Sequence, residues 1–558
     1  MASASSSDVE PAKLAHHAPS TDTLADKPAF KEPSSKGPFD GMPGIKPSED
    51  EDNVYLVDWD GPDDPANPKK HADEFPSRSW SFRKKWAATA IVSAFTFISP
   101  VSSSMIAPAS LQVANQFNEQ NTVIIAMMTS VFVLGYAFGP LILGPLSEIF
   151  GRSRVLQLAN MWYLAWNLGC GFAQNKGQLI AFRLLAGLGG SAPLSIGGGV
   201  LSDLWKPEQR GQAIAVYSLA PLLGPVVGPI AGGWIAEKST WRWVFWSTTI
   251  ADAVVQGFGL IYLRETYAPI LLEWKTRRLR KELGLSASDK NPSSTLSKSE
   301  KQSPSDDEKD VEKGQQRQNI VLRTVYSTAE RNWSEFIKHA LFRPFLMWVY
   351  EPIVQLLGLY MAFVYGLMYL FITTIPGIFE GVYHERVGIA GLHYLALGIG
   401  LSGASQVNAR LLDRVYSMLK ERNGGVGKPE FRLPSMFPAT VLLPAGLFIT
   451  GWTAQNHVFW LVPDIVRSCL SPFYSPAHPF AGHRTRRAGV ILTFQSVTTY
   501  VIDAFTLHAA SALAATTFLR SCAGFGFPLF APSMFSALGY GKGDTILACV
   551  AIAIGGPA

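Results

Sequence analysis

Charged side chains inside long apolar stretches are the residues of this sequence whose chemistry most needs an explanation. Arg183 interrupts one such stretch, Arg520 another, and Asp252 lies in a third. A charge at the centre of a bilayer costs about 2.5–3.5 kcal/mol on insertion scales, so each group needs a partner or a use. Arg520 has two open interpretations, since it could receive an anionic group or pair with a carbonyl. Arg183 is expected to bind carbonyls or a neighbouring acid, or to be functional.

No enzymatic, metal or cofactor site is expected. No Ser/His/Asp, HExxH or paired-carboxylate site emerges at depth, and there is no GxxxxGK[ST] phosphate loop for ATP. The cysteines show no CxxC or Cys/His spacing that would indicate a metal site or a disulfide framework; they are Cys170, Cys469, Cys522 and Cys549. An ion gradient is therefore the expected energy source.

Apolar runs of about 20 residues, each long enough to cross about 30 Å of hydrocarbon, dominate the chain. Charged residues make up only 16% of it, below the quarter typical of soluble domains. Six candidate spans precede a charged interval and six follow it, so we expect an all-α polytopic membrane protein. The spans lie near 86–106, 122–143, 155–173, 178–200, 213–236, 243–263, 352–374, 388–404, 434–454, 457–503, 510–538 and from 544 onward.

These runs divide the chain into four segments. We expect a cytosolic, disordered N-terminal tail (1–85), a six-helix bundle (86–263), a cytosolic central loop (264–343) and a second bundle (344–558). Lysine and arginine gather in alternate loops, which predicts that both termini are cytosolic. The polar N-terminus has no apolar signal-peptide core. The basic excess is interpreted as membrane topology, and no nucleic-acid partner is expected.

Two spans of the second bundle look damaged. Prolines, histidines and arginines fill 466–487, where the first part of the tenth span should be apolar. Lipid would not tolerate this segment as a spanning helix, so we interpret it as an artefact of the gene sequence or of splicing. The twelfth span is expected to be truncated, because the chain ends partway through it.

Three motifs carry a family resemblance. The loop after the second span reads GPLSEIFGRSR from Gly144 to Arg154. In it Gly144 would let two helices approach, Glu148 would accept from arginine or a helix N-terminus, and Arg152 and Arg154 would hold the cytosolic side. The fourth span reads LIAFRLLAGLGG around Arg183. The fifth contains a glycine and proline face suited to close, rocking contact, made of Gly224, Pro225, Gly228, Pro229, Gly232 and Gly233.

Together these motifs resemble those of major facilitator transporters, and the fifth-span motif resembles the signature of drug/proton antiporters. The segments VDWDGPDDPANPK from Val57 and ETYAPILLE from Glu265 narrow the resemblance to the fungal twelve-span drug:proton antiporters. The resemblance implies two six-helix bundles and a role of Arg183 in proton transfer. It also implies proton-coupled export of drugs, fungicides, toxins or secondary metabolites, or of polyamines.

The expected protein is thus a secondary transporter, acting as a monomer in the plasma membrane on small molecules and protons. A polyamine exporter, an uptake permease and a non-transporting sensor stay open as alternatives. Few carboxylates lie at depth, which favours a neutral or weakly charged aromatic or amphipathic substrate. Candidate cavity residues come from spans seven, eight, ten and eleven: Glu351, Tyr360, Tyr365, Tyr369, Tyr394, Gln495, Tyr500 and Arg520.

Overall fold

The computed structural model describes most of the apolar part of the chain. The described residues are 45–47, 54–60, 82–205, 210–283, 321–324, 333–381, 383–456, 490–505 and 509–556. All of them belong to one compact unit, Pro43–Ala558. The interrupted segment 466–487 lies outside the described residues, so the artefact interpretation stays a prediction.

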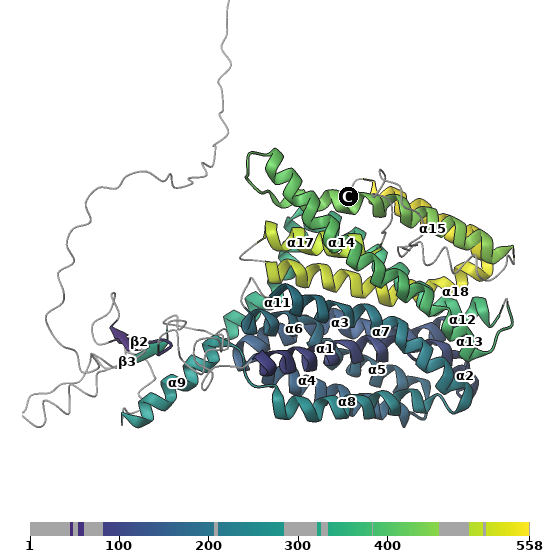
Figure 1. Ribbon diagram of the computed structural model, residues 1–558. Coiled ribbons are helices and arrows are strands. Elements are labelled where there is room, and N and C mark those ends of the chain that lie inside the picture. Colours follow the sequence, from purple (N-terminus) through teal and green to yellow (C-terminus); the bar gives the residue numbers. More distant parts are fainter. Residues whose placement is uncertain are drawn as a thin grey trace, which may run out of the picture. The chain divides into compact units, whose positions relative to one another are not determined.

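The first half of the fold is a bundle of helices (Figure 1). Their starts follow ordinary capping chemistry: the side chains of Asn121 and Asn175 accept hydrogen bonds from backbone N–H groups in the first turns of α3 and α5. The helices are α1 (Phe82–Ser104), η1 (Ala107–Ala109), α2 (Ser110–Gln116), α3 (Thr122–Phe150), α4 (Arg152–Gly171), α5 (Lys176–Gly190), α6 (Ala192–Leu204), α7 (Arg210–Lys238) and α8 (Arg242–Tyr262).

The second half contains the remaining long helices. They are α11 (Trp333–Tyr350), α12 (Pro352–Phe379), α13 (Val387–Leu392), α14 (Tyr394–Arg422), η3 (Pro429–Met436), α15 (Phe437–Gln455), α17 (Val490–Ala504) and α18 (Ala509–Gly555). Two differ from expectation. The eighth span continues as helix through its basic residues to Arg422, and the last two spans form α18, which is broken at Gly539, where φ is +76°.

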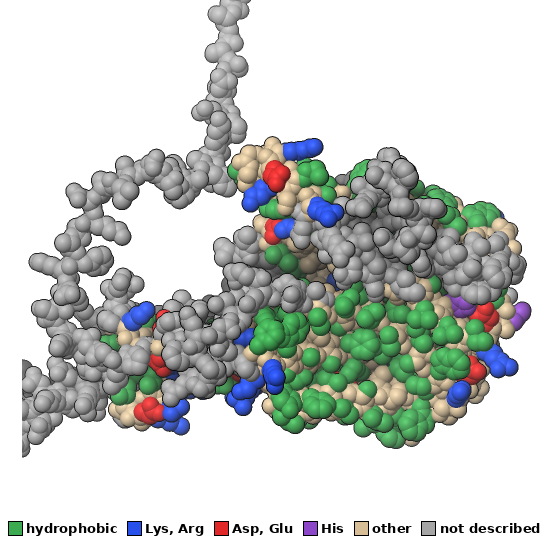
Figure 2. All heavy atoms as spheres, viewed as in Figure 1, with side chains coloured by type: hydrophobic (Ala, Val, Ile, Leu, Met, Phe, Trp, Pro, Cys, Tyr) green, Lys and Arg blue, Asp and Glu red, His purple; other side chains and the backbone are tan. Residues whose placement is uncertain are grey.

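Eight helical stretches in the described part of the chain are long and apolar enough to cross a bilayer. Apolar side chains on the outside agree with contact to lipid, since Leu158 and Trp162 of α4 and Ile250 and Phe258 of α8 are exposed. Figure 2 shows hydrophobic side chains spread over the face between two ends where charged side chains gather. An all-α membrane fold is therefore confirmed.

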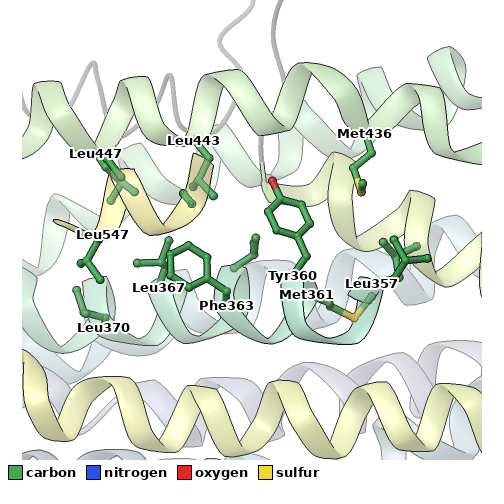
Figure 3. Packing of buried hydrophobic residues seen from close by; sticks show 14 of the residues in the cluster. Leu357, Tyr360, Met361, Phe363, Leu367, Leu370, Met436, Leu443, Leu447 and Leu547 are labelled. Atoms are coloured by element: carbon green, nitrogen blue, oxygen red, sulfur yellow. The ribbon is translucent and has the colours of Figure 1, made fainter. Parts of the chain in front are cut away.

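The two halves pack through α3 and α7 of the first half. The α3 helix lies against α18, and α7 lies against α14 and α13. Each half also has its own apolar core. In the first half Phe95, Leu156 and Leu201 are buried together, and in the second Leu367, Phe363 and Leu447 belong to one cluster (Figure 3).

The expectation of a disordered N-terminal tail is wrong for part of its length. The strands β1 (Ile45–Pro47) and β2 (Val54–Val57) pair antiparallel, and β2 pairs in parallel with β3 (Val321–Thr324) from the central loop. Val57 and Leu322 are buried in this small sheet. Its strands are short and rich in β-branched residues, which favour extended backbone.

The central loop begins with the predicted basic helix, α9 (Ala268–Glu282). Lys275 of α9 donates to the backbone oxygen of Asp58 and pairs with Asp60 at 2.6 Å, and Arg280 donates to Leu322 at 2.7 Å. The tail and the loop, which appear unrelated in the sequence, thus form one structure on α9.

Candidate functional site

Tyrosines meet where the two halves touch. We call Tyr136 of α3 and Tyr365 and Tyr369 of α12 the tyrosine cluster. The Tyr369 hydroxyl lies 3.1 Å from Ser103 Oγ of α1, which joins the two halves, and Tyr136 lies 2.6 Å from Ser99 Oγ. The rings of Tyr365 and Tyr369 are 5.1 Å apart. The structure thus brings two of the predicted cavity tyrosines to the junction between the halves.

Arg520 of α18 lies beside this cluster. Its guanidinium carbon is 5.4 Å from the ring centre of Tyr365 and 5.5 Å from that of Phe494 in α17. Such distances are typical of cation–π contacts. Its Nε is buried and has no hydrogen-bond partner among the described residues. Among the described residues, Arg520 therefore does not pair with a carbonyl.

Arg183 of α5 is buried between α1 and α3, with 1% of its surface exposed. Its Nη2 donates to the backbone oxygens of Ser103 at 3.0 Å and Thr129 at 2.9 Å. The rings of Phe132 and Phe245 lie within 6 Å of its guanidinium carbon. Its Nε and Nη1 find no partner among the described residues, and no acid in that part of the chain pairs with it. Carbonyls, and no neighbouring acid, hold this arginine.

The buried acid of the first half is Asp252 of α8, which is fully enclosed. Its Oδ2 accepts from Asn160 Nδ2 of α4 at 2.8 Å, while Oδ1 has no partner among the described residues. Asn160 also donates to Gln256 at 2.9 Å. Buried polar groups are normally satisfied, so an open carboxylate oxygen at this depth indicates a group whose state can change.

A second polar group continues this network toward the junction between the halves. Asn167 Nδ2 lies 2.9 Å from Thr248 and 2.8 Å from Thr249 of α8. Its Oδ1 accepts from Ser102 of α1, the residue before Ser103. This second group of α4 and α8 side chains therefore reaches Ser102, which precedes the serine that meets Tyr369.

The glycine and proline face of α7 packs backbone to backbone, as predicted. A Cβ at Gly224 would lie 2.7 Å from Pro100 Cβ, one at Gly228 would lie 2.6 Å from Val101 O, and one at Gly232 would overlap Met105 O. Pro225 and Pro229 are buried within the same helix. The α7 helix therefore packs closely on α1, and the rocking role stays a prediction.

The end of this α7 face touches the second half. A Cβ at Gly233 would lie 2.9 Å from Val387 O of α13. One helical turn further on, Glu237 Oε2 accepts from the backbone N–H of Gly388 at 2.8 Å. The motif of the fifth span thus forms part of the contact between the halves.

The loop between the second and third spans is held by acids outside its motif. Arg152 pairs with Asp203 of α6 at 2.6 Å, and Arg154 lies 4.5 Å from the Trp274 ring. Glu265 accepts from the backbone N–H groups of Arg152 at 2.9 Å and Ser153 at 3.2 Å, at the N-terminus of α4. A carboxylate is favourable there because it faces the positive end of the helix dipole.

Two expectations for this loop need correction. Gly144 does not serve helix approach, because a Cβ there would meet nothing within 4 Å; the close contacts of α3 fall at Gly135 and Gly139, which face α5 and Ser191. Glu148 does not cap the helix either. Among the described residues it makes no hydrogen bond or ion pair, because Glu265 and Asp203 occupy those positions.

The other predicted cavity residues differ in their surroundings. Tyr360 and Tyr500 are buried in the apolar core of the second half, and Figure 3 shows Tyr360 between leucines and methionines. The Tyr394 hydroxyl donates to Ile372 O. Glu351 is exposed at the start of α12, and Gln495 is half-buried in α17, next to Phe494. Of the proposed set, Tyr365, Tyr369 and Arg520 gather at the junction, and Tyr394 belongs to the same buried cluster as Tyr136 and Tyr369.

Sequence reasoning missed Asn160, which binds Asp252, and Asn167, which binds Ser102 of α1. Their spacing of seven residues in an otherwise apolar helix places them on one face of α4, and this signal could have identified them. It also missed Asp203 and the serines of α1. Ser99, Ser102 and Ser103 resemble ordinary small packing residues, so nothing local marks them.

A membrane-embedded bundle of two packed halves, with a polar and aromatic site at their junction, is the architecture of a transporter. The Major Facilitator Superfamily model matches residues 92–528. This chain belongs to that superfamily, and it is a transporter and not an enzyme.

Curated relatives and solved structures agree with this assignment. The chain is 43% identical over 500 residues to the efflux pump vrtL of Penicillium aethiopicum, covering 90% of this chain and 87% of that protein. It is 39% identical to the efflux pump radE of Floropilus chiversii, covering 91% and 84%. The fold matches the xylose transporter XylE of E. coli with a TM-score of 0.56 at 14% identity, covering 85% and 96%.

Proposed function

We propose that this transporter exports small hydrophobic or amphipathic organic compounds in exchange for protons. Export is supported by the efflux pumps that resemble the chain over most of its length. A proton gradient is supported by the lack of a phosphate-binding loop for ATP in the sequence. The compounds would bind at the junction of the two halves, beside the tyrosine cluster.

The observation that carries proton coupling is the environment of Asp252. A wholly buried carboxylate with one unpartnered oxygen is expensive, whereas the protonated acid is neutral and tolerable. Proton uptake at Asp252 therefore favours the enclosed arrangement of α4 and α8, and proton loss favours one that admits water. Each elementary charge moved across the membrane is worth about 2.3 kcal/mol per 100 mV.

Arg183 would transmit this change to the junction. It holds the backbone oxygens of Ser103 and Thr129, and the Ser103 side chain meets Tyr369 of the other half. A shift of α1 relative to α5 would therefore alter the contact between the halves. Two conformations that expose the junction alternately to each side are what a carrier requires.

Polyamines fit this site poorly. A polycation would need buried anions, yet the carboxylates that the sequence places in or near the spans are occupied elsewhere. Asp252 binds Asn160, Asp503 pairs with Arg432 at 3.0 Å, and Glu351 is exposed at the start of α12. Among the described residues, the charges beside the tyrosine cluster are arginines.

Transport in proteoliposomes with an imposed proton gradient tests the proposal. The wild type is expected to accumulate a neutral fluorescent hydrophobic probe, and Arg183→Ala is expected to abolish this. Asp252→Asn mimics the protonated acid, so gradient-driven accumulation should vanish while probe-for-probe exchange persists. Full gradient-driven transport by Asp252→Asn would remove Asp252 from the mechanism, and retained pH-dependent transport by Arg183→Ala would remove Arg183.

The same assay separates the alternatives. A purified wild-type protein that binds the probe but moves nothing would be a sensor, and accumulation in the opposite direction would indicate an uptake permease. A plasma-membrane monomer with both termini in the cytosol is part of the proposal. Epitope tags at the two ends, probed before and after permeabilisation of the cells, test the position of the termini. Tags on opposite faces of the membrane would contradict the proposed topology.

A further inference from the structure

Arg520 lacks a counter-ion in the described part of the chain. None of its contacts there is an ion pair, and its Nε is buried without a hydrogen-bond partner. The side chains around it are rings: Tyr365 and Phe494 lie within 6 Å of its guanidinium carbon, and Tyr217 of α7 interacts with it electrostatically. A charged residue within a span that has no ionic or carbonyl partner among the described residues marks a candidate substrate or ion site.

A second guanidinium lies on the other side of the tyrosine cluster. Arg183 interacts electrostatically with Tyr369 and Tyr136, and two of its nitrogens are unpartnered. The Tyr369 ring contacts the tilted ring of Tyr365, which faces Arg520. The aromatic surface at the junction is therefore flanked by two positive charges, and neither has an acid partner among the described residues.

We propose that Arg520 binds the anionic group of an acidic aromatic substrate, a carboxylate or an ionised phenol or enol, while Tyr365 and Phe494 contact its ring. This inference rests on the proposed export function and specifies its substrate class. A guanidinium presents two parallel N–H groups to a carboxylate, and such bonds strengthen where water is excluded. The flat rings beside it favour a planar aromatic body.

The charge of the binding partner follows from the geometry. A cationic compound would be repelled by both Arg183 and Arg520, whereas a neutral one would leave the Arg520 N–H groups unsatisfied. An acid with an aromatic ring satisfies the N–H groups and the ring faces together. The wild type should therefore prefer an aromatic acid over its neutral amide.

Transport of 2-naphthoate and 2-naphthamide by full-length protein in proteoliposomes tests this directly, since the two compounds share one ring system. The wild type is expected to transport the acid at least about tenfold faster than the amide, which corresponds to the loss of one charge-assisted contact. Arg520→Gln should remove that preference and bring the ratio of acid transport to amide transport close to one. Arg520→Lys keeps the charge and should retain a reduced preference for the acid.

The control variant is Arg277→Gln, which removes an exposed positive charge on α9 and should leave the preference unchanged. Size-exclusion profiles and thermal unfolding verify that each variant folds. Thermal stabilisation by 2-naphthoate in detergent measures binding without transport, and it should occur in the wild type and not in Arg520→Gln.

The outcomes separate the two proposals. Equal loss of acid and amide transport in Arg520→Gln, or an unchanged preference, would overturn the anion site and leave export standing. A wild type that transports a neutral probe but neither transports nor binds the acid would do the same. A wild type stabilised by the acid but unable to move any compound would overturn export and retain the site.

Discussion

The helices before α9 and those after it bury different side chains. In the first half, the single side chain of Asn167 in α4 bonds both α1 and α8. Arg183 bonds backbone carbonyls of α1 and α3. In the second half, the largest core cluster is apolar apart from tyrosine hydroxyls, and Figure 3 shows leucine, methionine, phenylalanine and tyrosine side chains from it. Two buried or half-buried threonines of this half, Thr374 and Thr450, bond within their own helices.

This difference suggests a division of labour between the halves. A hydrogen-bonded network with an open carboxylate oxygen can respond to a proton, whereas an apolar core can only pack. The second half instead brings Tyr365, Phe494 and Arg520 to the junction. We therefore assign energy coupling mainly to the first half and substrate contact mainly to the second.

The largest expected effect comes from helix contact in the first half. Gly232→Ala places a methyl group against the backbone oxygen of Met105, which cannot move aside, so we expect a loss of about 2–3 kcal/mol in unfolding free energy. Gly366→Ala in α12 meets only the Phe527 ring, which can rotate, and should cost about 1 kcal/mol or less. Denaturant or thermal unfolding in detergent measures both variants.

A third glycine controls for the substitution itself. A Cβ at Gly257 of α8 meets nothing within 4 Å, so Gly257→Ala should leave stability unchanged or slightly raised. Equal costs at all three glycines would show that backbone contact does not distinguish the halves.

The polar network should give the next largest effect. Asn167→Leu leaves Ser102, Thr248 and Thr249 without their shared partner, and should cost about 1–3 kcal/mol. Thr450→Val in the second half removes a bond to its own helix only and should cost less than about 0.5 kcal/mol. If the two variants unfold at the same temperature, the buried polar contacts of the first half do not contribute more to stability than the threonine contacts of the second.

A smaller effect is expected at the start of α4. Glu265→Gln removes the charge that faces two backbone N–H groups, and should lower stability by about 1 kcal/mol. Glu273→Gln serves as the comparison, because Glu273 is close to Glu265 in the sequence but forms only an exposed pair with Arg277. It should cost at most about 0.5 kcal/mol. Thermal unfolding of the two variants side by side measures the difference.

A pH dependence is expected in the second half, just beyond the end of α12. Burial raises the pKa of the Glu380 carboxyl from 4.5 to about 7. Because the folded state binds the proton more tightly than the unfolded state, this group makes stability fall as pH rises from about 4.5 to about 7. Glu380→Gln should flatten the unfolding temperature over that window. An unchanged profile would show that Glu380 does not titrate there.

Local patterns predicted much of the fold. The lengths of the apolar runs placed the helices, and the fifth-span motif predicted that α7 would pack closely on a neighbouring helix, which the structure shows to be α1. Tyrosines were less informative, because Tyr360, Tyr365 and Tyr369 lie on one helix and look equivalent in the sequence. Tyr360 faces the core of its own half, while Tyr369 faces Ser103 of the other.

The loop motif also shows that a sequence motif does not identify its distant partners. Its residues were recognised, yet the acids that hold Arg152 and the N-terminus of α4 are Asp203 and Glu265, from α6 and the segment after α8. Neither is near the motif in the chain. Likewise, β2 and β3 are separated by the whole first half, so no local signal could have paired them.

The sequence by itself determined where helices cross the bilayer and that Arg183, Asp252 and Arg520 lie within them, because hydrocarbon thickness and helical rise act on each stretch separately. Only the tertiary structure decided which of these charges has a partner. That depends on how each helix is rotated about its axis and on which neighbour it meets, and packing between distant segments sets both.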